Sequence, residues 1–187
     1  MAQKRKDWNG LISGFKASDL VFLDESGCNT DMTRRYAYSL GGSRAVDSAP
    51  LSKPKNTTIL SSIQLDGTLR YTTFSGGTTV ERFKRYLETD LLPHLNGNSV
   101  LIMDNMKSHH AKAVKNLLDS SGIRYTYLPP YSPDLNPIEK LWSKVKSLLR
   151  KFKARSLDAL PNAIQHAFQN VSPSDCSGWF RSCGYAL

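Results

Sequence analysis

Residues 57–77 read TTILSSIQLDGTLRYTTFSGG, and this stretch decides the class of fold. It holds two runs rich in β-branched and aromatic residues, joined at Asp66 and Gly67. An Asp-Gly pair between two such runs is a strong signal for a β-hairpin, because the tight turn needs residues that tolerate a positive φ. The sequence therefore predicts two antiparallel strands here.

Further strands are expected on both sides of the hairpin. DLVFLDE (19–25) and SVLIMDN (99–105) are short apolar runs that each end on acidic residues, and IRYTYL (123–128) is a third run of strand type. TRRYAYSLGG (33–42) is expected to form a shorter strand or hairpin arm before a Gly-Gly turn, and the polar stretch 43–56 to form a loop. The hairpin therefore has neighbours with which to build a sheet.

Helical spacing begins after the hairpin. The apolar residues of 78–95 recur at the period of one helix face, and Thr78 with Glu81 is expected to form a capping box at its start. Asn136 suits the N-cap and Pro137 the first position of a later helix. The other expected helices are 111–122, 137–152 and 157–170.

The predicted order of elements is strand, hairpin, helix, strand, helix, strand, helix. Early antiparallel strands followed by alternating helices and strands predict an α/β fold with a mixed sheet and helices on its faces. In such sheets, functional side chains gather at the carboxyl ends of the central strands.

Length and composition are those of a globular protein with one domain. The chain has 187 residues, of which 40% are hydrophobic and 22% are charged. No apolar run approaches the roughly 20 residues that span a bilayer, and the basic start MAQKRKDWNG has no apolar segment behind it. The three widely spaced cysteines are expected to be free thiols. These features predict a cytoplasmic protein with no membrane contact.

The net charge of +9, from 25 Lys+Arg against 16 Asp+Glu, favours a polyanionic partner such as nucleic acid. A charge that only keeps the protein in solution is the alternative. The clustering of basic residues favours nucleic acid, because a helix after residue 139 would present a basic stripe to a phosphate backbone. The stripe consists of Lys140, Lys144, Lys146, Arg150, Lys151, Lys153 and Arg155.

Three acidic residues are expected to meet at one site. Asp24 and Asp104 each end a predicted strand, and their carboxylates emerge side by side if the strands are parallel neighbours. Glu139 lies in the first turn of a predicted helix, behind a loop stiffened by four prolines. Three converging acids repel one another unless a cation joins them, and Mg²⁺ and Mn²⁺ prefer oxygen ligands. The sequence predicts a site for two Mg²⁺ ions, which Mn²⁺ can replace, suited to phosphodiester chemistry.

Each of the three acids also has a structural explanation when it is taken alone. An acidic residue at a strand end is commonly a turn or cap residue. A glutamate in the first turn of a helix is favoured by the helix dipole. The catalytic interpretation therefore depends on the three residues together.

Three motifs give the chain a family resemblance: VFLDESG (21–27), LIMDNMKSHHAK (101–112) and LPPYSPDLNPIEKLWSKVK (128–146). Nearly the whole chain resembles the catalytic part of transposases of the Tc/mariner superfamily, specifically the bacterial insertion-sequence branch. The third motif is long and specific. The 34 residues between Asp104 and Glu139 match the spacing of that superfamily's D…D…E triad.

The resemblance implies an RNase H-like fold with a mixed five-stranded sheet, and a DDE endonuclease in which Asp24, Asp104 and Glu139 bind two Mg²⁺ ions. It further implies cleavage of DNA at transposon ends and attack of the freed 3′-OH on target DNA, commonly at a TA dinucleotide. The implied partners are DNA and a second copy of the chain in the active complex. The implied location is the bacterial cytoplasm, in association with the nucleoid.

The chain departs from the family at its start. Family members usually carry two helix-turn-helix modules that recognise the transposon ends, whereas only about 18 residues precede the first predicted strand here. Residues 1–18 are therefore expected to be an extension or linker, and residues 19–187 the catalytic domain. The explanations left open are a truncated chain, an upstream frame or partner that supplies the helix-turn-helix modules, and a decayed element.

Further residues are candidates for contacts near the site. Asn105 and His109 match the family's D-N-x-x-x-H stretch. Asn105 is expected to orient the metal site or a phosphate, and His109 to contact DNA or to cap the following helix. Glu25 is expected to point to the opposite face of its strand from Asp24 and to have a structural role. The basic candidates for DNA contacts are Lys140, Lys144, Lys146, Arg34 and Arg35.

For three residues near Glu139, we expect a structural role and not a catalytic one. Tyr131 and Trp142 are expected to pack the proline-rich loop against the helix, with base stacking as the alternative. Asp134 is expected to face solvent.

Two functions compete with a strand-transferring transposase. A nuclease or resolvase of the same fold would cut DNA without joining it. A catalytically silent remnant would bind DNA without cutting it.

Overall fold

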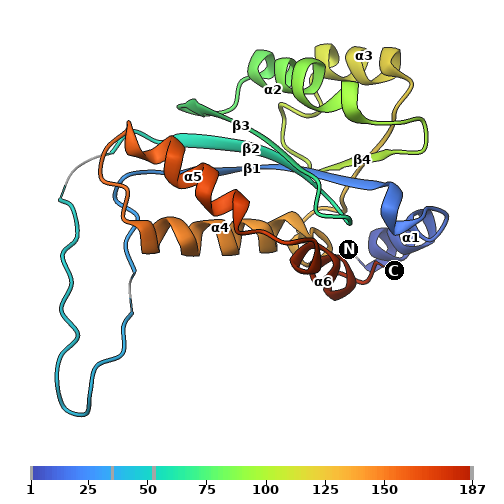
Figure 1. The fold of residues 1–187 in the computed structure, drawn as a ribbon. Coiled ribbons are helices and arrows are strands. Elements are labelled where there is room, and N and C mark those ends of the chain that lie inside the picture. Colours follow the sequence, from blue (N-terminus) through green and yellow to red (C-terminus); the bar gives the residue numbers. More distant parts are fainter. Residues whose placement is uncertain (1, 35, 52–53, 186–187) are drawn as a thin grey trace.

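The structure is a computed structural model of the chain and describes residues 2–34, 36–51 and 54–185. Its strands are β1 (Leu20–Cys28), β2 (Thr57–Gln64), β3 (Leu69–Ser75), β4 (Val100–Met103) and β5 (Arg124–Tyr127). They form a five-stranded sheet in the order β3-β2-β1-β4-β5 (Figure 1). β1, β2 and β3 pair antiparallel, whereas β4 and β5 run parallel to β1. The predicted mixed sheet is confirmed.

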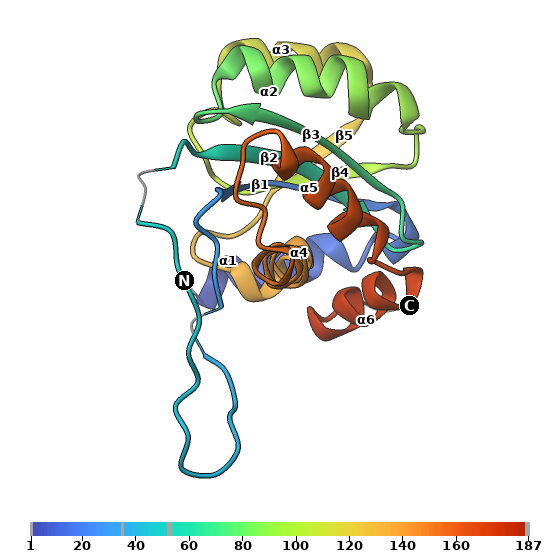
Figure 2. The same cartoon turned by 60° about the vertical axis from the view of Figure 1, so that its left-hand side comes forward.

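Helices cover both faces of this sheet (Figures 1 and 2). They are α1 (Ala2–Ile12), α2 (Val80–Tyr86), α3 (Lys112–Ser121), α4 (Ile138–Phe152), α5 (Ala159–Gln169) and α6 (Pro173–Ser182). α2 and α3 lie on one face, and α4 and α5 lie on the other, each pair above its own hydrophobic cluster. The expected α/β architecture with helices on both faces is confirmed.

The central strand β1 is buried on both of its faces. Phe22 belongs to the hydrophobic cluster that includes α4 and α5, and Leu23 belongs to the cluster that includes α2 and α3. Because side chains alternate along a strand, the next residues follow the same rule. Asp24 therefore lies on the α4 face, and Glu25 lies on the opposite face, as predicted.

The parallel pairing of β1 with β4 brings two acidic residues together. Leu23 is paired with Met103 in the register of these strands. The residues that follow them, Asp24 and Asp104, therefore lie side by side at the carboxyl edge of the sheet. This is the edge at which open α/β sheets place their functional groups.

The β2–β3 hairpin forms where the sequence predicts it, and its strands pair up to Ile63 and Leu69 on either side of the turn. Gly67 in the turn has a φ of 91°. A Cβ atom on Gly67 would come within 2.9 Å of the Cα atom of Pro173, the first residue of α6. Glycine is therefore required both by the backbone conformation and by the close approach of α6.

The strand expected within 33–42 is wrong for the part of that range that the structure describes. Residues 36–51, which we call the arm, contain no strand and extend away from the sheet (Figure 1). β1 is already paired on both sides, with β2 and β4, so the arm finds no free neighbour beside it. The predicted turn is confirmed, because Ser43 N donates a hydrogen bond to Leu40 O and Gly42 has a φ of 77°.

The helix predicted over 78–95 is not one continuous α-helix. α2 passes into a π-helical turn (Leu87–Leu91) and then into a 3-10 turn that contains Pro93. Proline has no N–H to donate, so a regular α-helix cannot continue through it. The expected capping box at Thr78 is also wrong, because the N-cap is Thr79, whose side chain accepts a hydrogen bond from the backbone of the third helical residue.

The N-terminal segment is helical, although the sequence predicts only an extension there. Trp8 of α1 is buried against the main hydrophobic cluster. The sequence of α1, AQKRKDWNGLI, is mostly polar and gives no clear apolar stripe. At the other end of the chain, Phe180 and Tyr185 are buried, so the described part of the tail packs against the domain.

Two further expectations concern the cysteines and the membrane. Cys28, Cys176 and Cys183 are free and buried, which confirms the predicted free thiols. None of the described helices is both long enough and apolar enough to span a bilayer.

Candidate active site

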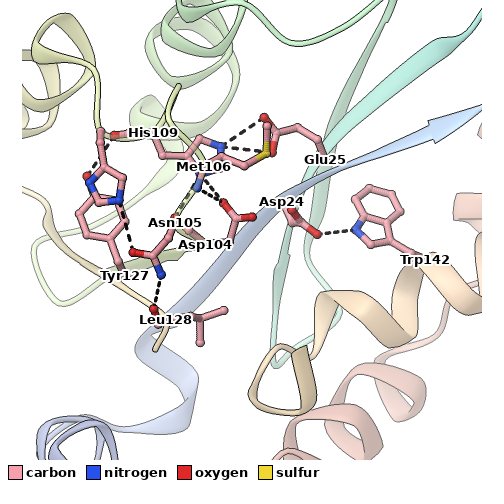
Figure 3. Close-up of polar contacts among 10 residues, drawn as sticks. Asp24, Glu25, Asp104, Asn105, Met106, His109, Tyr127, Leu128 and Trp142 are labelled. Carbon is pink, nitrogen blue, oxygen red and sulfur yellow. Dashed lines mark hydrogen bonds and ion pairs between the residues drawn. The ribbon is translucent and has the colours of Figure 1, made fainter. Parts of the chain in front are cut away.

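The first carboxylate of the site, Asp24, is 8% exposed at the end of the buried part of β1. The indole N–H of Trp142, on α4, donates a 3.0 Å hydrogen bond to Asp24 Oδ2 (Figure 3). Burial raises the pKa of Asp24 to about 7, and the negative charges of Glu25 and Asp104 add to this effect. Asp24 is thus a carboxyl group with a strong electrostatic preference for a positive neighbour.

The second carboxylate, Asp104, follows β4 and is partly exposed. Its Oδ1 atom lies 2.8 Å from His109 Nδ1 and accepts a 2.9 Å hydrogen bond from Met106 N. Burial tends to raise the pKa of Asp104, but the hydrogen bonds from His109 and Met106 and the charge of His109 outweigh it, and the pKa is lowered. The two neighbouring aspartates therefore differ in acidity, because their partners differ.

His109 is 0% exposed and joins the two faces of the site. Its Nε2 atom lies 3.1 Å from Glu25 Oε2, and its Nδ1 atom faces Asp104 (Figure 3). Its ring stacks on Phe83. Burial alone would lower its pKa, but the hydrogen bonds and charges of the two carboxylates raise it to about 9. His109 is therefore a buried cation between two acids. His109 does not cap α3, whose N-cap is Ala111 and has no side-chain cap hydrogen bond. The side chain of His109 has no exposed surface in this structure, and a contact of His109 with DNA stays a prediction.

The third carboxylate, Glu139, lies in the first turn of α4 and is exposed. It lines a pocket of about 410 Å³ together with Asp24 and Asp104. Within residues 2–34, 36–51 and 54–185, no three His, Cys, Asp or Glu side chains are arranged as a ready metal site. The structure thus brings the three acids to one pocket, and their joint binding of metal stays a prediction.

The proline-rich loop that leads to Glu139 is fixed at several points. Leu128 N donates a 2.8 Å hydrogen bond to Met103 O at the end of β4. Asn105 Nδ2 donates a 2.5 Å hydrogen bond to Leu128 O. Further along, Tyr185 OH donates a 2.6 Å hydrogen bond to Leu135 O. Asn105 therefore orients the loop of the site, while a contact of Asn105 with phosphate stays a prediction.

Asn136, two residues before α4 begins, also lines the pocket. It is 3% exposed, and its Oδ1 atom is buried and has no hydrogen-bond partner among the described residues. The side-chain N-cap expected of it does not form. A buried oxygen without a donor costs free energy, which a cation or a water in the pocket would offset.

The donor set of this pocket fits a hard divalent cation. Three carboxylates and the amide side chains of Asn105 and Asn136 line it, and Mg²⁺ and Mn²⁺ prefer such oxygen ligands. The pKa of Asp24 is raised because its negative charge would be buried and would lie beside another carboxylate. A bound cation would stabilise that negative charge.

Several residues of the expected basic stripe have partners within the domain, and the contact of the stripe with DNA stays a prediction. Lys140 is exposed, whereas Lys144 Nζ lies 2.5 Å from Asp175 Oδ2. Lys146 is half-buried and lies close enough to Cys28 for its charge to act on that thiol. Lys153 lies beyond the end of α4 and pairs with Asp47.

The remaining basic candidates are outside α4. Arg34 is exposed in the segment that leads to the arm. Arg35 lies outside the described residues. Contacts of these residues with DNA stay predictions.

Sequence reasoning missed several residues of the site. The sequence predicted that Trp142 packs the proline-rich loop against the helix, but it did not indicate the hydrogen bond from Trp142 to Asp24. Asp134 is exposed, as predicted, and it also forms an ion pair with Arg5 of α1 that the sequence did not indicate. Tyr131, expected in the core, is 88% exposed. A tryptophan three residues after Glu139 lies on the same side of the helix, and this spacing was the one available signal.

Comparisons with known proteins agree with this geometry. Residues 19–161 match the family described as DDE superfamily endonuclease. A curated relative, the Tc1 transposable element transposase of Caenorhabditis elegans, is 27% identical over 97 residues, which are 50% of this chain and 36% of the relative.

Solved structures of Mos1 transposase share the fold. A pre-cleavage Mos1 transpososome has a TM-score of 0.77 and 19% identity, covering 100% of this chain and 63% of the Mos1 chain. The catalytic domain of Mos1 mariner transposase has a TM-score of 0.71 and 17% identity, covering 97% of this chain and 85% of the other. The RNase H-like fold expected from the sequence is confirmed. The chain spans about a third of its curated relative and three fifths of the Mos1 chain in the transpososome.

Proposed function

Because this chain belongs to the DDE superfamily endonucleases, we propose that it is the catalytic domain of a transposase of the Tc/mariner type. It cleaves DNA at transposon ends and joins the freed 3′-OH to target DNA, at TA dinucleotides. The observation that carries this proposal is the pairing of β1 with β4, which brings Asp24 and Asp104 to a pocket that Glu139 also lines.

The proposed metal ligands are Asp24, Asp104 and Glu139, which would hold two Mg²⁺ ions or, in their place, Mn²⁺. When bound, such ions supply a water of lowered pKa and stabilise the departing 3′ oxygen of a phosphodiester. Structures of Mos1 paired-end complexes with Mn and with Mg support this choice of ions.

The surrounding side chains hold two of these carboxylates in position by hydrogen bonds. Trp142 holds one oxygen of Asp24, so that the other oxygen remains for a cation. His109 holds Asp104 in its charged form and is itself held by Glu25. A site whose ligands are fixed before the substrate arrives loses little free energy in reorganisation when charge develops.

The arm supports a second part of the proposal, a homodimer in the active complex. Its described residues are almost all exposed and include large apolar side chains. These are Tyr36, Tyr38, Leu40, Val46 and Leu51. An extended segment that offers so much apolar surface is suited to contact another chain. A helix-turn-helix partner or upstream segment would supply the recognition of transposon ends.

The test is a joining assay with the protein, Mg²⁺, a plasmid and a pre-cleaved duplex end that carries a free 3′-OH. We expect joined products from the parent, and at least about a hundredfold less from Asp24→Asn, Asp104→Asn and Glu139→Gln. Glu88→Gln is the control. Glu88 lies in the turn after α2, on the face of the sheet opposite to α4, and forms an exposed ion pair with Lys84.

The competing functions give different results in the same assay. Cutting without joining would support a nuclease or resolvase. DNA binding by the parent with no nicking under any condition would support a silent remnant. Full activity in the three acid variants would overturn the proposed site.

A further inference from the structure

Tyr131 has an unusual conformation at the mouth of the pocket. Its side chain is 88% exposed, and its φ is 55°. Among the described residues, Tyr131 and Lys153 are the two non-glycine residues with positive φ. The left-handed conformation costs a bulky residue about 1–3 kcal/mol, and residues strained in this way cluster at functional sites. A residue with a strained backbone and an exposed ring contributes little to the stability of the fold.

The exposure of the ring is imposed by an ordered backbone. Pro130 precedes Tyr131, and the following Ser132 is buried. Ser132 Oγ accepts a 3.2 Å hydrogen bond from Arg5 Nη1 and lies 3.4 Å from Pro130 O. The loop is thus fixed on both sides of Tyr131. The ring is presented to solvent by a rigid support and is not part of a loose loop.

The surroundings of Tyr131 indicate the chemistry of a ligand. Tyr131 lines the same pocket as the three carboxylates, along with the exposed side chain of Met106 and several prolines. Prolines offer no N–H and cannot bind phosphate oxygens by hydrogen bonds. This side of the pocket is therefore suited to a flat, weakly polar group that is joined to the phosphate, which cations bound by the three acids would hold. In a DNA substrate, that group is a nucleobase.

A base inside a duplex has both faces covered by its neighbours, whereas the last base at a strand end has one face free. An aromatic side chain that stacks on a base contributes about 1–3 kcal/mol and accepts any base, because each has a π-face. A single exposed ring beside the acids has the geometry for one such contact.

We propose that the ring of Tyr131 stacks on the nucleobase next to the phosphodiester that the three carboxylates act on, and so positions the strand end in the pocket. This inference rests on the proposed function, since it assumes a DNA substrate at Asp24, Asp104 and Glu139. It makes Tyr131 a substrate-positioning residue that recognises a base of any identity.

The test is a two-by-two comparison of binding affinities in Mg²⁺. One duplex has an intact 3′-terminal nucleotide with a free 3′-OH, and the other has the same end without its terminal base. The proteins are the parent, Tyr131→Phe and Tyr131→Ala, with Leu157→Ala as the control for an exposed apolar side chain that lies outside both the pocket and the arm. Thermal melting checks that all variants fold.

We expect the parent and Tyr131→Phe to bind the intact end at least about fivefold more tightly than the abasic end, from the stacking energy. Tyr131→Ala should bind both ends equally, and Leu157→Ala should discriminate as the parent does. Equal discrimination by the parent and Tyr131→Ala would overturn the stacking contact. DNA binding by the parent without any discrimination would also overturn it, yet leave the proposed function intact. A parent that binds neither duplex would contradict the proposed function itself.

Discussion

At the scale of single residues, the contact between Trp142 and Asp24 is the sharpest feature of the site. Trp142→Phe keeps an aromatic ring in the core but removes the donor to Asp24 Oδ2. We expect a loss of about 2 kcal/mol in the free energy of unfolding, because a buried charge-assisted hydrogen bond is lost. Cleavage should fall by more than tenfold, because the carboxylate of Asp24 is no longer held in place. The affinity for DNA should be unchanged.

Urea unfolding and a cleavage assay measure the two effects separately. Trp179→Phe is the matched control, since Trp179 lies on α6 away from the pocket. Parental cleavage by Trp142→Phe would show that the indole does not position Asp24.

The strain at Tyr131 predicts an inverted order of stability between two variants. At most positions glycine is less stable than alanine by roughly 0.5–1 kcal/mol, because it has more freedom in the unfolded chain. At a φ of 55° the order reverses, since alanine carries a Cβ and glycine does not. We expect Tyr131→Gly to be more stable than Tyr131→Ala by about 1 kcal/mol. Denaturant titration measures this difference, and the opposite order would contradict the strained conformation.

At the scale of elements, His109 connects β1 with the loop after β4. Glu25, at the opposite face of β1, and Asp104 both face its ring. The folded-state pKa of about 9 lies above the ordinary value of 6.5, so the stabilisation from protonated His109 is complete below about pH 6.5. It is lost as the pH rises through about 9.

We therefore expect the free energy of unfolding, measured with EDTA present, to fall between pH 7 and pH 10 by up to about 3 kcal/mol more in the parent than in His109→Gln. His166→Gln, an exposed residue of α5, serves as the control and should follow the parent. Parallel curves for the parent and His109→Gln would show that no charged histidine joins these elements.

At the scale of the whole molecule, the arm carries large apolar side chains that the domain itself does not bury. Replacing Tyr38 and Leu40 by serine removes apolar surface that is exposed in the single chain. We expect the free energy of unfolding of the monomer to be unchanged, within about 0.5 kcal/mol. Sedimentation in the presence of duplex ends should show a weaker dimer. A dimer of undiminished affinity would exclude the arm from the interface.

The fold was predictable in those parts that depend on local sequence signals or on general rules for strand pairing. Asp66-Gly67 marks the hairpin, and Gly122, with a φ of 70°, ends α3 as predicted. The neighbouring positions of Asp24 and Asp104 followed from two apolar runs that each end on an acid. These features depend on residues close together in the chain or on a general rule for parallel strands.

The parts that could not be predicted depend on contacts between distant residues. Trp8 packs on the core although α1 has no apolar stripe of its own. Lys144 and Lys146 look alike in sequence, but one pairs with Asp175 and the other lies near Cys28, because α6 and β1 flank α4 on different sides. The bridge made by His109 likewise joins residues 84 positions apart. No local pattern carries this information.

The most direct test of the account is a crystal structure of the protein grown with Mn²⁺, with the ion located by its anomalous scattering. The account predicts Mn²⁺ in the pocket, bound by oxygen atoms of Asp24 and Asp104, with the carboxylate of Glu139 turned inward as a ligand. Mn²⁺ held by the two aspartates while Glu139 points away, or a pocket without Mn²⁺ at saturating concentration, would contradict it.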